Sequence, residues 1–130
     1  MKPVVLDTNA LAMVLTDDRR LPDEIRTTIS NAPRTSISAI SFYEIGQKVR
    51  LGKWDAMAKF APDLVEIVVA DGFDLISLSP DQAVRASLLE WSHRDPFDRM
   101  IAAVAIGENA HLASSDAAFD ELKDVTRVWA

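Results

Sequence analysis

Four acidic residues stand at positions from which their side chains could act together. Asp7 follows the apolar run 4–6, and Asp116 follows the run 111–115. Glu44 and Asp98 each lie at the start of a stretch with helical spacing of apolar residues. In an open parallel α/β sheet, all strands end along one edge, and ligands bind in the crevice outside it. We therefore expect the four carboxylates to gather at that edge.

Such a group of carboxylates is typical of a metal site. Like charges at close range repel one another unless a cation lies between them. Mg²⁺ and Mn²⁺ prefer oxygen ligands. Zinc fits less well, because the chain has no cysteine and its two histidines, His93 and His111, lack the paired spacing of zinc ligands. We expect each histidine to be an exposed or packing residue and not a ligand.

The chemistry indicated is metal-assisted hydrolysis of a phosphodiester. The sequence has no Gly-rich phosphate loop and no Ser-His-Asp or Cys-His arrangement. One or two metal ions would lower the pKa of a water, hold the phosphate and offset charge on the leaving oxygen. The carboxylates would act first as ligands, and the sequence leaves open which one serves as general base.

The same acids also fit helix caps. Two capping boxes are expected, at Ser41–Glu44 and Asp95–Asp98. Pro96 suits the first position of a helix capped by Asp95, and Asp7 and Asp116 could be N-caps themselves. The two roles are compatible, because the cap at 95 fixes where the side chain of Asp98 points.

Further polar residues flank the acids and could support the site. One set could orient the carboxylates or hold metal-bound water, or could simply form turns. This set consists of Thr8, Asn9, Ser114 and Ser115. Others are candidates for phosphate contacts; they are Lys48, Arg50, Arg94 and Arg99. Lys48 also has the spacing of a helix ion pair with Glu44.

The elements that must position these residues alternate between strands and helices. Strands are expected at 4–6, 35–38, 75–78, 111–115 and 125–129. Helical segments are expected at 10–15, 22–31, from 41 to a stop at Gly52, 54–72 with a break near Pro62, 81–91, 97–110 and a short turn at 116–119. This order predicts an α/β sandwich with a mainly parallel sheet. A chain of 130 residues fits one domain, 1–130.

Composition limits the classes of partner. The net charge of −6 argues against a passive nucleic-acid coat, although residues 44–59 hold four basic residues against two acidic ones. The absence of cysteine suits a reducing compartment, and we expect a cytoplasmic protein. No apolar run approaches the length of a membrane span, which predicts no membrane association.

Several segments together resemble the PIN-domain nucleases, and among them the VapC-type toxins of bacterial toxin-antitoxin pairs. The resemblance rests on "VVLDTNALAMVL", "SAISFYEIGQKVRLGKW", "HRDPFDRMIAA" and "ASSDAAFDEL". Carried over position by position, the acidic quartet of the family falls on Asp7, Glu44, Asp98 and Asp116. Asp95 matches an additional acid of the toxin-like members, and Ser114 stands where the family often has Thr.

The resemblance implies a fold, an activity and partners. The fold is a three-layer sandwich with a central sheet flanked by helices. The activity is that of a Mg²⁺- or Mn²⁺-dependent endoribonuclease toxin, commonly a homodimer, which acts on RNA. A VapB-type antitoxin would neutralise it by covering the site, often with a basic side chain among the acids.

Single residues argue against two other classes of protein, and two further functions stay open. A haloacid-dehalogenase-type phosphatase needs a second Asp two positions after Asp7, where this chain has Asn9. A receiver-type signalling domain needs a Lys after a late strand, which "HLASSD" does not offer. A PIN-fold nuclease of RNA processing outside a toxin pair, and a non-catalytic PIN-like binding module, stay open.

Overall fold

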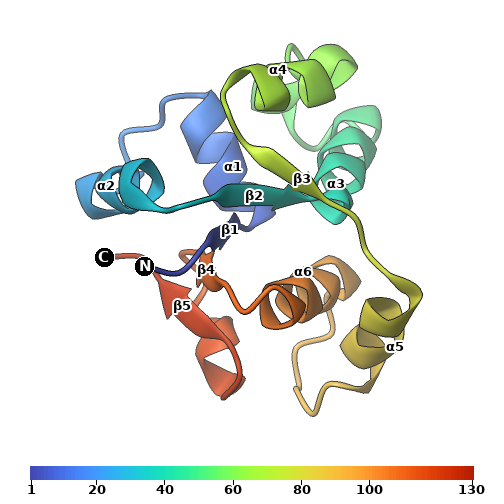
Figure 1. Ribbon diagram of the computed structural model, residues 1–130. Coiled ribbons are helices and arrows are strands. Elements are labelled where there is room, and N and C mark those ends of the chain that lie inside the picture. Colours follow the sequence, from blue (N-terminus) through green and yellow to red (C-terminus); the bar gives the residue numbers. More distant parts are fainter.

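A five-stranded parallel sheet forms the middle layer of the computed structural model, which describes residues 1–130 (Figure 1). The strands are β1 (Val4–Leu6), β2 (Thr35–Ser38), β3 (Asp74–Ile76), β4 (His111–Ala113) and β5 (Thr126–Val128). Their order in the sheet is β3-β2-β1-β4-β5, and every neighbouring pair is parallel. Leu6 pairs with Ile37 on one side and Ala113 on the other, so three strands end level with one another.

Helices cover both faces of this sheet, as Figure 1 shows. One side carries α1 (Thr8–Leu15), α2 (Asp23–Asn31), α3 (Ala39–Arg50) and α4 (Leu64–Ala70). The other side carries α5 (Pro80–Leu88) and α6 (Pro96–Gly107), which pack against each other. The predicted three-layer α/β sandwich is confirmed.

The central strand β1 explains why the chain begins with a run of apolar residues. Successive side chains of a strand point to opposite faces of the sheet. Val4 and Leu6 accordingly pack with the helices on one face, and Val5 packs with Ile101 and Leu112 on the other. All three residues of β1 are buried, as expected for a strand covered on both faces.

Most of the expected elements are confirmed, with small shifts at their ends. β1 and β2 have the predicted bounds, while the other three strands are shorter or displaced by a residue. The predicted break near Pro62 is also present. The segment 54–72 consists of two short 3₁₀ turns, Asp55–Met57 and Ala61–Asp63, followed by α4. The turn predicted after Asp116 is the 3₁₀ helix Ala117–Glu121.

The predicted capping box at Ser41–Glu44 is wrong. The N-cap of α3 is Ser38, whose Oγ accepts a hydrogen bond from the Ile40 N–H at 3.1 Å. The helix begins directly after β2, without a loop, so Glu44 lies in its second turn. Ser41 is buried, and its hydroxyl lies 2.9 Å from that of Thr8. Glu44 therefore has no capping role.

None of the helices is both long enough and apolar enough to cross a membrane.

Replacement of Leu6 by Ala tests the central position of β1. Leu6 lies in the sheet and is fully buried under the helices of one face. A cavity at such a site lowers the free energy of unfolding by about 2 to 5 kcal/mol. The free energy of unfolding, measured by urea denaturation, should fall by that amount. Leu51→Ala, at a residue that is 49% exposed, should change it by less than about 0.5 kcal/mol. Equal losses in the two variants would contradict the assigned core.

Candidate metal centre

Asp7 lies at the end of β1 and caps α1. Its Oδ1 accepts a hydrogen bond from the Ala10 N–H at 2.8 Å, and the residue is only 4% exposed. Burial raises the pKa of its carboxyl from 3.8 to about 6, against the opposing effect of hydrogen bonds from Ser114 and the Ala10 N–H. The charges of Asp98 and Glu44 raise this pKa further, so these two carboxylates lie near Asp7.

Glu44 reaches the same region from α3. It is 4% exposed, and its Oε2 lies 2.6 Å from the Nζ of Lys48, one helical turn later. The predicted helix ion pair is therefore present. The other oxygen, Oε1, is buried and has no hydrogen-bond partner. A buried oxygen without a partner destabilises a protein by about 1 to 3 kcal/mol, and it is a ready ligand for a cation.

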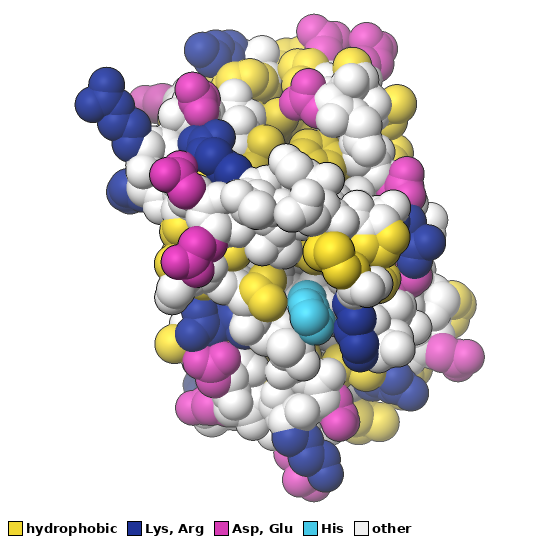
Figure 2. Space-filling view, turned by 60° about the vertical axis from the view of Figure 1, so that its left-hand side comes forward, with side chains coloured by type: hydrophobic (Ala, Val, Ile, Leu, Met, Phe, Trp, Pro, Cys, Tyr) yellow, Lys and Arg dark blue, Asp and Glu magenta, His cyan; other side chains and the backbone are white.

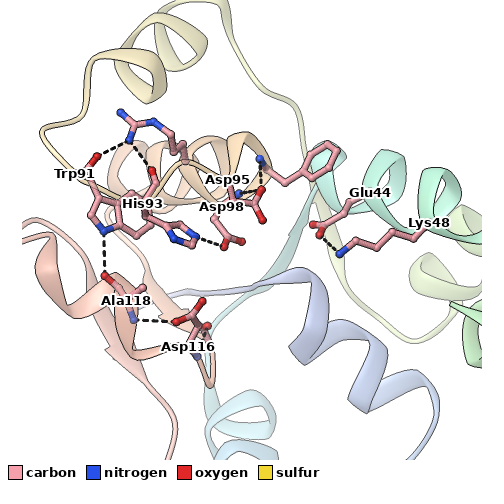
Figure 3. Close-up of polar contacts among 11 residues, drawn as sticks. Glu44, Lys48, Trp91, His93, Asp95, Asp98, Asp116 and Ala118 are labelled. Atoms are coloured by element: carbon pink, nitrogen blue, oxygen red, sulfur yellow. Dashed lines mark hydrogen bonds and ion pairs between the residues drawn. The ribbon is translucent and has the colours of Figure 1, made fainter. Parts of the chain in front are cut away.

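Asp98 lies in the first turn of α6, where its position is set by the cap before it. The Asp95 Oδ1 accepts hydrogen bonds from the N–H groups of Phe97 and Asp98, at 2.9 and 3.4 Å. Asp95 and Pro96 thus begin the helix as predicted, but the expected capping box is wrong in its second half, because the Asp98 carboxylate bonds His93 and not the Asp95 N–H. The Oδ2 of Asp98 lies 2.7 Å from the Nε2 of His93 (Figure 3).

The environment of Asp98 disfavours its charged form. Burial is the largest cause of its raised pKa, and the charges of Asp95 and Glu44 add to it. The hydrogen bond and the charge of His93 act in the opposite direction. Two acids of the predicted quartet, Asp7 and Asp98, therefore bind protons more tightly than usual. Burial is the main reason, and the charges of the neighbouring carboxylates act in the same direction.

Asp116 approaches from the end of β4. Its carboxylate caps the 3₁₀ helix by accepting from the Ala118 N–H at 2.9 Å, and its own N–H donates to the Ser114 Oγ at 3.0 Å. Donor atoms of Asp116, Asp98 and His93 all lie within 4.8 Å of one another. Figure 3 shows these three side chains converging, with Glu44 farther along the same edge.

The residues fit a divalent cation. Asp98 and Asp116 lie together with His93, with donor atoms within 4.8 Å of one another. Asp7 and Glu44 lie outside that group, although the charge of Glu44 acts on both Asp7 and Asp98. Burial is the main cause of the raised pKa of Asp7 and Asp98, the neighbouring carboxylate charges add to it, and the Glu44 Oε1 is buried without a partner. A hard cation bound to these oxygens would relieve both the repulsion and the unpaired atom.

Comparison with protein families agrees with this geometry. The model of the PIN domain matches residues 4–125. The chain belongs to the PIN-domain family. No curated protein matches it.

Solved structures share the fold of this PIN domain at low sequence identity. They include VapBC2 from Rickettsia felis bound to a DNA fragment from its promoter, at 20% identity and a TM-score of 0.70, over 98% of this chain and 99% of that chain. VapBC-1 from nontypeable Haemophilus influenzae is 19% identical with a TM-score of 0.70, over 97% of this chain and 96% of that chain. FitAcB from Neisseria gonorrhoeae is 20% identical with a TM-score of 0.64, over 95% of each chain.

The predicted supporting residues divide into several roles. Thr8 and Ser41 join the first turns of α1 and α3 through their hydroxyls. The Ser114 hydroxyl accepts a hydrogen bond from the Asp116 N–H, and it also acts to lower the pKa of Asp7. Asn9 lines a groove beside the acids. The other residues that line this groove are Lys48, Lys53 and Trp54.

Arg99 was expected to contact phosphate, and the structure gives it another role. Its guanidinium makes five hydrogen bonds, all to backbone carbonyls of the segment 86–93, and these use its five N–H groups. No donor of Arg99 is left for phosphate in this arrangement. Arg99 instead holds the chain segment that carries His93.

His93 is the residue of the site that the sequence did not reveal. The expectation of an exposed or packing residue is only partly right, because its ring packs at 4.7 Å from that of Trp91 while its Nε2 bonds Asp98. Trp91 is fixed in turn by its indole N–H, which donates to the Ala118 carbonyl at 3.1 Å. His93 lies five residues before Asp98, and no helical or strand periodicity covers that interval.

Asp7→Asn should stabilise the metal-free protein at neutral pH. The folded chain raises the pKa of Asp7 from 3.8 to about 6, so the contribution of this group to stability is present below pH 3.8 and is lost as the pH rises through 6. The loss amounts to about 3 kcal/mol at most. Asn removes this loss and is as good an N-cap as Asp.

The measurement is urea denaturation of EDTA-treated wild type and variant at pH 4.5 and pH 7.5. The variant should gain about 1 to 3 kcal/mol over the wild type at pH 7.5, and clearly less at pH 4.5. A gain of the same size at both pH values would show that the buried charge of Asp7 is not its cause.

Arg99→Lys should loosen the segment 86–93. Lysine has three donors on a flexible chain and cannot reproduce the five hydrogen bonds of the guanidinium. We expect a loss of about 2 to 4 kcal/mol in unfolding free energy, and faster hydrogen exchange in peptides that cover this segment. Arg94→Lys, at an exposed neighbour, is the control. The role of Arg99 is contradicted if both variants exchange like the wild type.

Proposed function

We propose that this PIN domain is a metal-dependent endoribonuclease toxin of the VapC type. The observation that supports the proposal is the group of Asp98, Asp116 and His93 at one edge of the sheet, near the buried Asp7 and Glu44, with one oxygen of Glu44 left unpaired. All four acids expected of a nuclease are present. Their presence favours a catalytic protein over a non-catalytic binding module, because such a module would usually lack one of the metal-binding acids.

The four carboxylates would hold Mg²⁺ or Mn²⁺, which activates a water and offsets charge on the phosphate during hydrolysis. Asp7 and Glu44 are buried and form the floor of the site. Asp98 and Asp116 are more accessible, so they face the side from which a substrate arrives. The caps at Asp7, Asp95 and Asp116 hold the backbone of three of these segments in place.

The groove at the end of α3 offers a path for RNA. It is lined by Asn9, Lys48, Lys53 and Trp54, and so joins two cations and an aromatic ring to the acidic edge. Cations can contact phosphates, and an aromatic face can stack on a base. On the face shown in Figure 2, basic and acidic side chains are interspersed, without a basic stripe. RNA is therefore proposed to enter along the groove.

A VapB-type antitoxin is the proposed inhibitor, and a homodimer the proposed assembly. A solved structure with the same fold, from Klebsiella pneumoniae, is a toxin-antitoxin complex. A basic side chain of an antitoxin could occupy the acidic edge, where the Glu44 Oε1 has no partner. Exposed apolar side chains on α5, Val84 and Leu88, offer a surface for a second copy.

RNA cleavage by the purified protein tests the proposal. Internal cleavage should require Mg²⁺ or Mn²⁺ and stop with EDTA. Asp98→Asn should lower the rate by at least about 100-fold, because it removes a charged oxygen ligand. Asp71→Asn, at an exposed acid beside the opposite edge of the sheet, should leave the rate unchanged.

The melting temperature separates a metal ligand from a structural acid. Asp98→Asn should not lower it in metal-free buffer, since the variant relieves repulsion among the carboxylates. Equal cleavage by wild type and Asp98→Asn would assign the activity to a contaminant. A sharp fall in melting temperature would instead give Asp98 a mainly structural role.

A further inference from the structure

We propose that His93 supplies a nitrogen ligand to the metal centre, beside Asp98 and Asp116, and thereby raises its affinity for transition-metal ions relative to Mg²⁺. The inference rests on the metal centre of the proposed function, and it adds a ligand outside the four acids. It concerns which cation the site selects.

The geometry points to His93 because its donor atom already lies inside the group of acids. Its Nε2 is 2.7 Å from the Asp98 Oδ2, and one donor atom each from His93, Asp98 and Asp116 lie within 4.8 Å of one another. Ligands on a common ion lie about 2.0 to 2.2 Å from it, so two of them are separated by at most about 4.4 Å. Small side-chain movements would bring all three atoms onto one ion.

The position of His93 is fixed by several contacts that do not involve the acids. The Arg99 guanidinium donates to the carbonyls of His93 and Trp91, at 2.9 and 3.0 Å. The imidazole packs on the Trp91 ring, and Trp91 packs on Phe119 at 5.3 Å. The loop therefore presents the imidazole to the acids as a preformed group, and little order must be gained when an ion binds.

A second observation indicates that a cation belongs at this edge. The Glu44 Oε1 is buried without a partner in a residue that is 4% exposed, and the charge of Glu44 acts on both Asp7 and Asp98. An ion pair between His93 and Asp98 alone would leave that oxygen unsatisfied. A cation bound among the acids would instead give that oxygen a partner of opposite charge.

A mixed nitrogen and oxygen site has a different preference from an all-oxygen site. Imidazole suits Zn²⁺, Fe²⁺ and Ni²⁺, whereas carboxylate and water suit Mg²⁺. The four acids by themselves would bind Mg²⁺ and Mn²⁺. With His93 as a ligand, the site should bind Zn²⁺ more tightly than the acids alone would, with little change toward Mg²⁺.

The chain has two histidines, which makes a direct test simple. His111 is the first residue of β4, at the opposite end of the strand from Asp116, and serves as the matched control. The full-length protein is labelled with ¹⁵N in its histidine rings, freed of metal with EDTA, and titrated with Zn²⁺. The ring nitrogens of His93 should shift strongly at one equivalent, those of His111 should not, and His111→Gln assigns the signals.

Binding of the metals alone, measured by calorimetry, gives the second readout. His93→Gln should weaken Zn²⁺ binding about tenfold or more and change Mg²⁺ binding by less than about threefold. His111→Gln should change neither. Zn²⁺ binding without a shift of the His93 ring, or an equal loss of Zn²⁺ and Mg²⁺ affinity in His93→Gln, would overturn the proposal.

These outcomes are separate from those of the cleavage assay. If RNA is cleaved with Mg²⁺ but the His93 ring does not respond to Zn²⁺, the nuclease proposal stands and His93 is no ligand. If the ring responds but no RNA is cleaved under any metal, the nitrogen ligand stands and the nuclease proposal fails.

Discussion

Burial of neighbouring carboxylates at one edge of the sheet is the constraint on which this structure depends. Asp7, Glu44 and Asp98 are close enough for their charges to act on one another, and the first two are almost fully buried. Burial, together with repulsion from neighbouring carboxylates, disfavours the charged forms of Asp7 and Asp98 and so destabilises the folded chain without a cation. The surrounding structure must hold the acids together against that force.

Backbone N–H groups and two basic side chains oppose the repulsion. Asp7 and Asp116 each accept a hydrogen bond from the start of a helix, and Asp95 does the same one turn before Asp98. Helix N-termini carry partial positive charge, so each cap also lowers the energy of a carboxylate there. On the two sides of the site, Lys48 bonds Glu44 and His93 bonds Asp98. Helix capping and metal binding are thus served by the same residues.

The parallel sheet is the first part of the structure that positions the side chains of the site. Residues at the ends of β1, β2 and β4 are paired in register, so the chain leaves the sheet at one edge three times. The second part is the end of α5 and the loop that follows it, residues 86–93, which Arg99 holds through backbone carbonyls. This loop reaches the site from the other face of the sheet and adds the imidazole to the carboxylates.

The sequence by itself determined the strands around the site and the caps at Asp7, Asp95 and Asp116, because these follow from short-range patterns. The rule that parallel strands end together also placed acids at one edge, where Asp98 and Asp116 lie close to each other. Tertiary structure alone decided the roles of His93 and Arg99, and the start of α3 at Ser38 in place of Ser41. A loop has no periodicity, so the direction of a side chain on it depends on contacts with distant segments. His93 faces Asp98 because Trp91 rests on Ala118 and Phe119, more than twenty residues away in the chain.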